Sequence, residues 1–223
     1  MGPRLAATPR TQLRQVRTGF DPQEHGFRFR NTFPITLRDL GLPYTAQLGQ
    51  GLCGGMALHA KRLFMSGEPV PSDPKLPAKG TSLYTALWRR QLESLFPTTW
   101  ARFIAWQARL DERGSGPMGP IGQATRREWP KLRRMLDGGE PALLGLVRIS
   151  SKNPVRAGAN HQVLCIGYRF DPGPRRLRLD TYDPNHPGTV VQLFVDLGQP
   201  EHRITISQST GEKLRGFFVT AAQ

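Results

Sequence analysis

The stretch QLGQGLCGGMALHA, which runs from Gln47 to Ala60, places Cys53 between glycines at the start of a helical pattern. Apolar residues after the cysteine recur three and four positions apart, and this spacing predicts a helix over residues 52–66. The N-terminus of a helix stabilises negative charge, so a thiol placed there loses its proton more easily than a free cysteine does. Cys53 is therefore a candidate nucleophile, and a cysteine packed beneath a loop without a chemical role is the alternative.

Two glycines, Gly54 and Gly55, directly follow the cysteine. Because glycine has no side chain, a substrate chain can approach such a backbone closely. The backbone N–H groups also stay open to a developing oxyanion. We therefore expect both glycines to contact the substrate.

A base for the thiol is predicted at His161, which opens the apolar strand HQVLCIGYRF. The strand runs into the turn DPGPRR and returns through LRLDTYDPN, a hairpin pattern that brings Asp183 or Asn185 back toward the histidine. A polar acceptor at that place fixes the tautomer of the imidazole and stabilises its charged form. Asp183 is the preferred acceptor and Asn185 the alternative, while a plain Asp-Pro turn is the reading without a chemical role. Asn160, directly before the histidine, is expected to contact the substrate.

The order of the predicted elements indicates an α+β fold, because helices come first and strands follow. Besides the helix over 52–66, three helical patterns are present: one capped by Thr81 and ending at Pro97, one over about 99–111, and one with capping-box spacing between Thr125 and Glu128. The predicted strands are ALLGLVRIS, HQVLCIGYRF, RRLRLDTYD, TVVQLFVDL, HRITISQ and LRGFFVTA.

The chain of 223 residues is long enough for one domain with a sizeable core. Residues 1–19 carry arginines, no acidic residue and little periodicity, and they predict a flexible basic arm. Residues 20–223 are expected to form a single domain. The 20 prolines and 24 glycines favour many turns over a helical bundle.

Composition narrows the classes of partner and cofactor. A net charge of +14 favours acidic partners, but no nucleic-acid motif is present, so nucleic acid is not expected as the main partner. No apolar run approaches the ~18 residues of a membrane span. The first twenty residues lack the apolar core of a secretory signal, which predicts a cytoplasmic protein with free thiols. The histidines and cysteines show no metal-ligand spacing, so neither a metal nor another cofactor is expected.

Three blocks in chain order resemble those of the papain-like cysteine peptidase superfamily: Cys53 in QGLCGGMA, His161 in NHQVLCIGY, and Asp183 with Asn185 in YDPN. The YDPN block is similar to the bacterial branches, including bacteriocin-processing peptidases, in which an aspartate followed by proline takes the place of asparagine. The resemblance implies a Cys-His-Asp triad. It also implies a papain-like fold, in which an N-terminal helical half carries the cysteine and a C-terminal antiparallel sheet carries the histidine and the aspartate.

The same resemblance assigns Gln47, six residues before the cysteine, to the oxyanion hole, with Gln50 as a rival. The implied activity is that of a hydrolase or acyltransferase on amide bonds, through a thioester intermediate, with a peptidase acting on a protein or peptide as the preferred form. Transamidation and deamidation use the same chemistry. A catalytically inactive papain-like binding or effector module is an alternative, and a basic nucleic-acid-binding protein is another.

Overall fold

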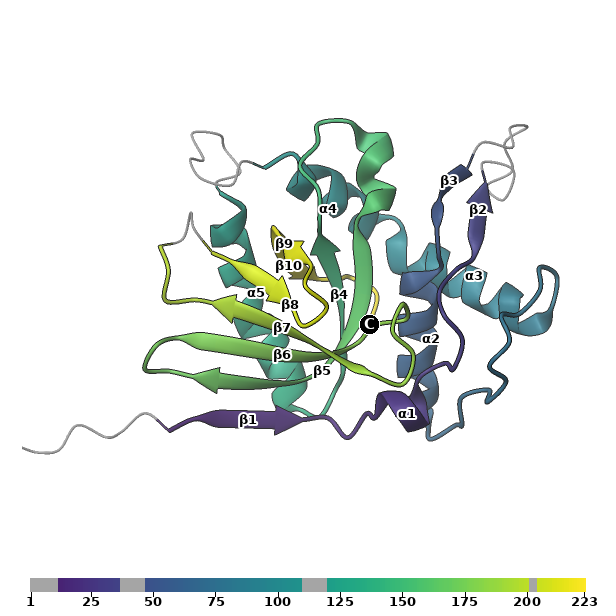
Figure 1. The fold of residues 1–223 in the computed structure, drawn as a ribbon, viewed down its shortest axis with the longest axis horizontal. Coiled ribbons are helices and arrows are strands. Elements are labelled where there is room, and N and C mark those ends of the chain that lie inside the picture. The colour runs from purple at the N-terminus through teal and green to yellow at the C-terminus, as the bar shows by residue number, and fades with distance from the viewer. Residues whose placement is uncertain (1–11, 37–46, 110–119, 201–203) are drawn as a thin grey trace, which may run out of the picture.

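The computed structural model describes residues 12–36, 47–109, 120–200 and 204–223. The chain has an α+β fold (Figure 1). The helical elements are α1 (Pro22–His25), α2 (Cys53–Ser66), α3 (Ser82–Leu95), α4 (Thr98–Gln107), α5 (Ile121–Asp137) and the 3₁₀ helix η2 (Pro154–Ala159). The strands are β1 (Arg14–Arg17), β2 (Pro34–Thr36), β3 (Gln47–Gln50), β4 (Ala142–Val147), β5 (His161–Asp171), β6 (Arg176–Tyr182), β7 (Val190–Asp196), β8 (Ile206–Gln208), β9 (Lys213–Leu214) and β10 (Gly216–Val219).

The main sheet is antiparallel and has the strand order β10-β4-β5-β6-β7-β8-β9, while β2 and β3 form a separate hairpin. In Figure 1, α5 lies behind this sheet, and α2 and α3 lie next to each other on the right of it. No helix in the described ranges is both long enough and apolar enough to cross a lipid bilayer.

The first eight residues of the central strand β5, 161–168, are buried on both faces, which explains their nearly continuous apolar sequence. Val163 and Cys165 pack into the core formed with α5, and the alternate residues Leu164 and Ile166 pack into the core that contains α2. Full burial of one such aliphatic side chain contributes about 1.5–3 kcal/mol to folding. The two cores therefore hold α2 and α5 against opposite faces of β5, and this fixes the start of α2 relative to the start of the strand.

The N-terminal segment differs from the predicted flexible arm. Residues 14–17 form β1, which pairs with residues 167–170 of β5, beyond Cys165, the last residue of β5 that pairs with β4. The Arg14 side chain also makes an ion pair of 2.7 Å with Asp137 at the end of α5. An uncovered strand edge presents unpaired N–H and C=O groups, and β1 satisfies them. Residues 1–11 of the predicted arm lie outside the described residues.

The start of α5 also differs from its prediction. The helix begins at Ile121, after Pro120, and Thr125 lies buried inside it instead of capping it. Glu128 accepts hydrogen bonds from Arg102 and from the Val219 N–H, so it holds α4 and β10 and closes no capping box. Tertiary contacts here override the local pattern.

Candidate active site

Three side chains with complementary chemistry meet where α2, β5 and β6 begin or end. Cys53 is the first residue of α2, His161 is the first of β5, and Asp183 follows the last residue of β6. Because β5 and β6 are antiparallel neighbours, the end of β6 returns to the start of β5. The His161 Nε2 atom lies 2.8 Å from the Asp183 Oδ1 atom, and the two side chains are 3% and 1% exposed.

The imidazole of His161 also interacts with the thiol of Cys53. Each of the two side chains shifts the pKa of the other toward the charged form. Since Asp183 engages Nε2, the nitrogen left for the sulfur is Nδ1. The imidazole therefore lies between a sulfur and a carboxylate, in the arrangement that a nucleophile, its base and an orienting group require.

The electrostatics of the three groups favour a charged pair. Burial alone raises the pKa of the Cys53 thiol, but the charge and hydrogen bond of His161 outweigh it, and the net pKa is below the ordinary value. Burial opposes the charged form of His161 too, yet Asp183 and Cys53 together raise its pKa to about 10. Asp183 has a lowered pKa because the attraction of His161 exceeds the cost of burial. At neutral pH these shifts favour a thiolate beside an imidazolium.

Asp183, and not Asn185, is placed to orient the histidine. The Asn185 Nδ2 atom lies 3.4 Å from the same Nε2 atom, but an amide N–H group cannot accept the proton that an imidazolium donates. The Asn185 backbone N–H instead donates to Asp183 Oδ1 at 2.8 Å. Asn185 thus helps to hold the carboxylate.

The second cysteine has the opposite environment. Cys165 is fully buried in the core, and burial raises its pKa to about 12. Both cysteines are free thiols. Cys53 is partly exposed, so the two thiols are expected to differ strongly in reactivity.

Gly54 and Gly55, which the sequence suggested as substrate contacts, are buried by packing inside the protein. A Cβ atom at Gly54 would lie 2.0 Å from Gln162 Oε1, and one at Gly55 would lie 2.2 Å from the Leu87 carbonyl oxygen. The Gly55 N–H already donates to Gln91 Oε1 at 2.7 Å. The absence of side chains at these two glycines therefore allows α2 to pack closely against α3 and β5.

Gly54→Ala is expected to lower the free energy of unfolding by about 1–3 kcal/mol, the usual cost of overpacking. The added methyl group meets the buried Gln162 and Ser94 side chains. Gly138→Ala is the matched control, because Gly138 has a φ of −82° and its nearest neighbour would lie 3.4 Å from a Cβ atom. Urea unfolding of both variants measures the difference, and equal stability of the two would contradict the packing argument.

Asn160, the third expected substrate contact, is buried and its polar atoms are used inside the protein. Its Nδ2 atom donates to Gln107 Oε1 and to the Ala157 carbonyl, each at 3.1 Å, and its Oδ1 atom accepts the Arg148 N–H at 3.0 Å. The side chain therefore ties η2, α4 and the end of β4 to the residue before His161. It also borders the cavity described below.

The glutamines assigned to the oxyanion hole lie at the two ends of β3, which pairs with β2. The side chains of Gln47 and Gln50 are outside the part of the chain that the structure describes. Their oxyanion role stays a prediction.

Asn31 is a residue near the site that the sequence reasoning missed. It is 7% exposed and connects the two loops that carry the reactive groups. Its Oδ1 atom accepts the Leu52 N–H at 2.5 Å, its Nδ2 atom donates to Asn185 Oδ1 at 3.1 Å, and its own N–H donates to the Pro184 carbonyl at 3.0 Å. The alternation in FRFRNTF indicates the position of Asn31: every second residue is a buried phenylalanine, and Asn31 takes one of these inward positions.

Asn31→Ala is expected to lower the rate constant for alkylation of Cys53 by a neutral reagent about tenfold, because both loops lose an anchor. Asn31→Asp keeps the acceptor for the Leu52 N–H but loses the donor to Asn185, so it should fall between the wild type and alanine. A loss of thermal stability with an unchanged alkylation rate would show that Asn31 stabilises the fold without positioning the site.

A cavity of about 680 Å³ opens above the three groups. Cys53, His161 and Asn185 are among its lining residues. Residues of α3, α4 and η2 also line it.

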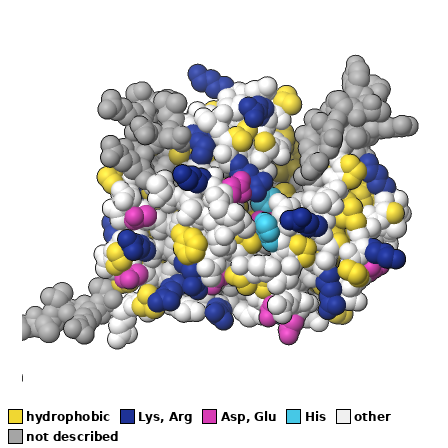
Figure 2. Space-filling model, viewed as in Figure 1, with side chains coloured by type: hydrophobic (Ala, Val, Ile, Leu, Met, Phe, Trp, Pro, Cys, Tyr) yellow, Lys and Arg dark blue, Asp and Glu magenta, His cyan; other side chains and the backbone are white. Residues whose placement is uncertain are grey.

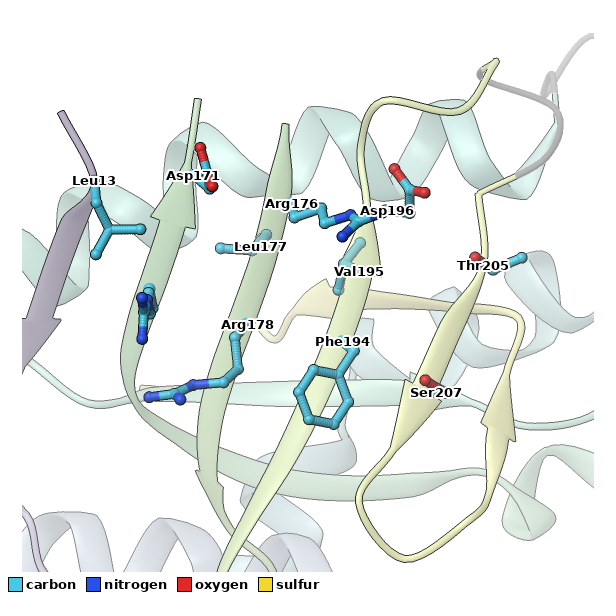
Figure 3. A pocket seen from close by; sticks show the side chains of 11 residues that line it. Leu13, Asp171, Arg176, Leu177, Arg178, Phe194, Val195, Asp196, Thr205 and Ser207 are labelled. Carbon is cyan, nitrogen blue, oxygen red and sulfur yellow. The ribbon is translucent and has the colours of Figure 1, made fainter. Parts of the chain in front are cut away.

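A second hollow of about 410 Å³ lies on the outer face of the sheet, across β5, β6, β7 and β8 (Figure 3). Arg178 and Phe194 project into it from neighbouring strands, with Asp171 and Asp196 nearby. Its described lining contains neither cysteine nor histidine. It therefore offers no counterpart to the nucleophile and base at Cys53.

No group of three or more His, Cys, Asp and Glu side chains within the described ranges is arranged to hold a metal ion. No family model, curated protein or solved structure matches the chain.

Proposed function

We propose that the protein is a papain-like cysteine hydrolase or acyltransferase that acts on amide bonds, with a peptidase as the preferred form. The observation that carries the proposal is the placement of His161. Its Nε2 atom lies 2.8 Å from the buried Asp183 carboxylate, and its ring interacts with a thiol at the first residue of a helix. The cavity at this thiol gives a substrate access to it.

In the proposed reaction the Cys53 thiolate attacks the carbonyl carbon of the substrate, and the carbonyl electron pair moves to oxygen. The Cys53 backbone N–H and the Gln47 side chain are the proposed donors to this oxyanion. The oxyanion then collapses and the C–N bond breaks, while the His161 imidazolium gives its proton to the departing amine. A thioester on Cys53 remains.

The second half of the reaction resolves the thioester. His161, now neutral, takes a proton from water as the water oxygen attacks the thioester carbonyl, and the C–S bond breaks to regenerate the thiolate and the imidazolium. An amine that attacks in place of water gives transamidation. Asp183 holds the imidazole in the orientation and tautomer that both halves need.

An active ester tests the proposal without knowledge of the natural substrate. The full-length protein is mixed with p-nitrophenyl acetate, and intact-mass and peptide mass spectrometry locate any acetyl group. We expect rapid acetylation at Cys53, reversed by neutral hydroxylamine as a thioester is. Cys53→Ser should not form this adduct. Acetylation confined to lysines, at the same rate in the variant, would support the inactive binding module instead.

A further inference from the structure

The cavity at Cys53 has a broad apolar wall on α3 and α4. The members that form it are Trp88, Leu92, Leu95, Phe96 and Trp100. Phe96 stacks on Trp100 with ring centroids 6.3 Å apart, although 54% of its surface is exposed. An exposed apolar surface of this kind inside a cleft is typical of a site for an apolar group of a ligand.

The part of the lining that η2 contributes is less apolar. Val155 and Arg156 both line the cavity and are exposed, Val155 to 67%. The next three residues, 157–159, have the sequence AGA, so their side chains are small. Arg156 is exposed and makes no ion pair with any residue that the structure describes.

The arginine, aspartate and glutamate content of the cleft favours positive charge. Its described lining contains two arginines, Arg148 and Arg156, and no aspartate or glutamate. Glu212 neutralises Arg148 through contacts of 2.8 and 2.9 Å, which leaves Arg156 as the uncompensated charge in the described lining. Lys and Arg side chains are also spread over the face shown in Figure 2, where Asp and Glu side chains are fewer. A cleft of one charge sign concentrates ligands of the opposite sign.

We infer that the substrate is a peptide that seats a large apolar side chain on the α3–α4 wall and places an acidic side chain beside Arg156. This inference rests on the proposed function and narrows its substrate class. The apolar contact supplies binding, and the charge of Arg156 selects among peptides with the same apolar residue.

The high net charge of the whole chain would attract any acidic peptide, so the control must carry the same change in charge. Arg169 is suitable, because it is exposed on the outer face of the sheet and borders the hollow of Figure 3. It lies opposite Arg178 in the register of β5 and β6, so a glutamate there faces a cation. Arg169→Glu and Arg156→Glu therefore alter the net charge equally and differ only in location.

The experiment uses three pools of dodecapeptides with identical apolar positions, in which the remaining variable positions are acidic, amide or basic residues. Initial cleavage rates are followed by mass spectrometry, and in parallel each pool competes with iodoacetamide for Cys53. One exposed ion pair is worth up to about fivefold in affinity, and charge reversal adds repulsion. We expect the acidic pool to be preferred to the basic pool by about tenfold, and Arg156→Glu to abolish that preference while Arg169→Glu preserves it.

The two readouts separate this inference from the proposed function. If the acidic pool protects Cys53 from iodoacetamide and Arg156→Glu removes this protection, the inference is supported. This holds even when no peptide is cleaved, and the lack of cleavage then counts only against the proposed hydrolase. Cleavage of all three pools at equal rates overturns the inference and leaves the hydrolase intact. The inference also fails if the two charge reversals reduce the preference equally, or if no pool protects Cys53.

Discussion

Replacing His161 with alanine is expected to slow the turnover of p-nitrophenyl acetate at about pH 6 by at least about 10²-fold. Without the imidazolium, burial is the main remaining influence on Cys53, and it raises the pKa of the thiol. A thiol with an ordinary pKa near 8.5 is only about 0.3% thiolate at that pH. The difference in rate between the variant and the wild type should become smaller as the pH rises toward 9, because the thiol then ionises without the imidazolium. Release of p-nitrophenol measured across this range checks the prediction.

His59→Ala is the matched control for that experiment. His59 lies on the same helix as Cys53 but stacks on Phe27, with ring centroids 5.9 Å apart. Its removal should leave the turnover of the ester within about twofold of the wild type. Equal losses in the two variants would show that the effect of His161 comes from packing and not from the proton that it holds.

Asp183→Ala is expected to lower the same turnover about 10²-fold near neutral pH, with a change in its pH profile. Asp183 is the strongest of the groups that raise the pKa of His161, so without it that pKa falls. The imidazolium then loses its proton at lower pH, and the alkaline limb of the profile should move downward from about pH 10, the pKa of His161 in the intact site. A pH titration of the initial rate measures the shift.

Asp183→Asn separates charge from orientation. Asparagine keeps the shape of the side chain and an oxygen that can accept both the His161 Nε2–H and the Asn185 N–H. We expect its alkaline limb to move in the same direction as in Asp183→Ala, with a smaller loss of rate. An unshifted limb in both variants would mean that Asp183 does not stabilise the charged imidazole.

Much of the site was visible in the sequence because its parts are local. The helix predicted over 52–66 is α2, which begins at Cys53, and Thr81 caps α3 as its hydroxyl accepts the Tyr84 N–H at 3.3 Å. The hairpin of β5 and β6 follows from two apolar runs and a turn between them. Capping groups, periodicity and turns act over a few residues, so a single sequence records them well.

The remainder depends on contacts between distant segments. The pairing of β1 with β5 joins residues about 150 positions apart, and the position of Asn31 depends on the loop at Pro184. The cavity wall arises from α3, α4 and η2, which only the assembled sheet brings together. Short-range patterns carry no information on such pairs, and Gly54 shows the consequence: its smallness suggested an open substrate path, yet the structure uses it for close packing.

The most direct test of the central claim, that His161 holds Cys53 as a thiolate, is the rate of iodoacetamide alkylation of each cysteine as a function of pH. Peptide mass spectrometry distinguishes Cys53 from Cys165 in one sample. We predict that Cys53 reacts rapidly at about pH 6, at a rate that changes little up to about pH 8, while Cys165 stays unmodified because burial raises its pKa to about 12. A Cys53 rate that rises about tenfold per pH unit through this range, as for an ordinary thiol, would contradict the account.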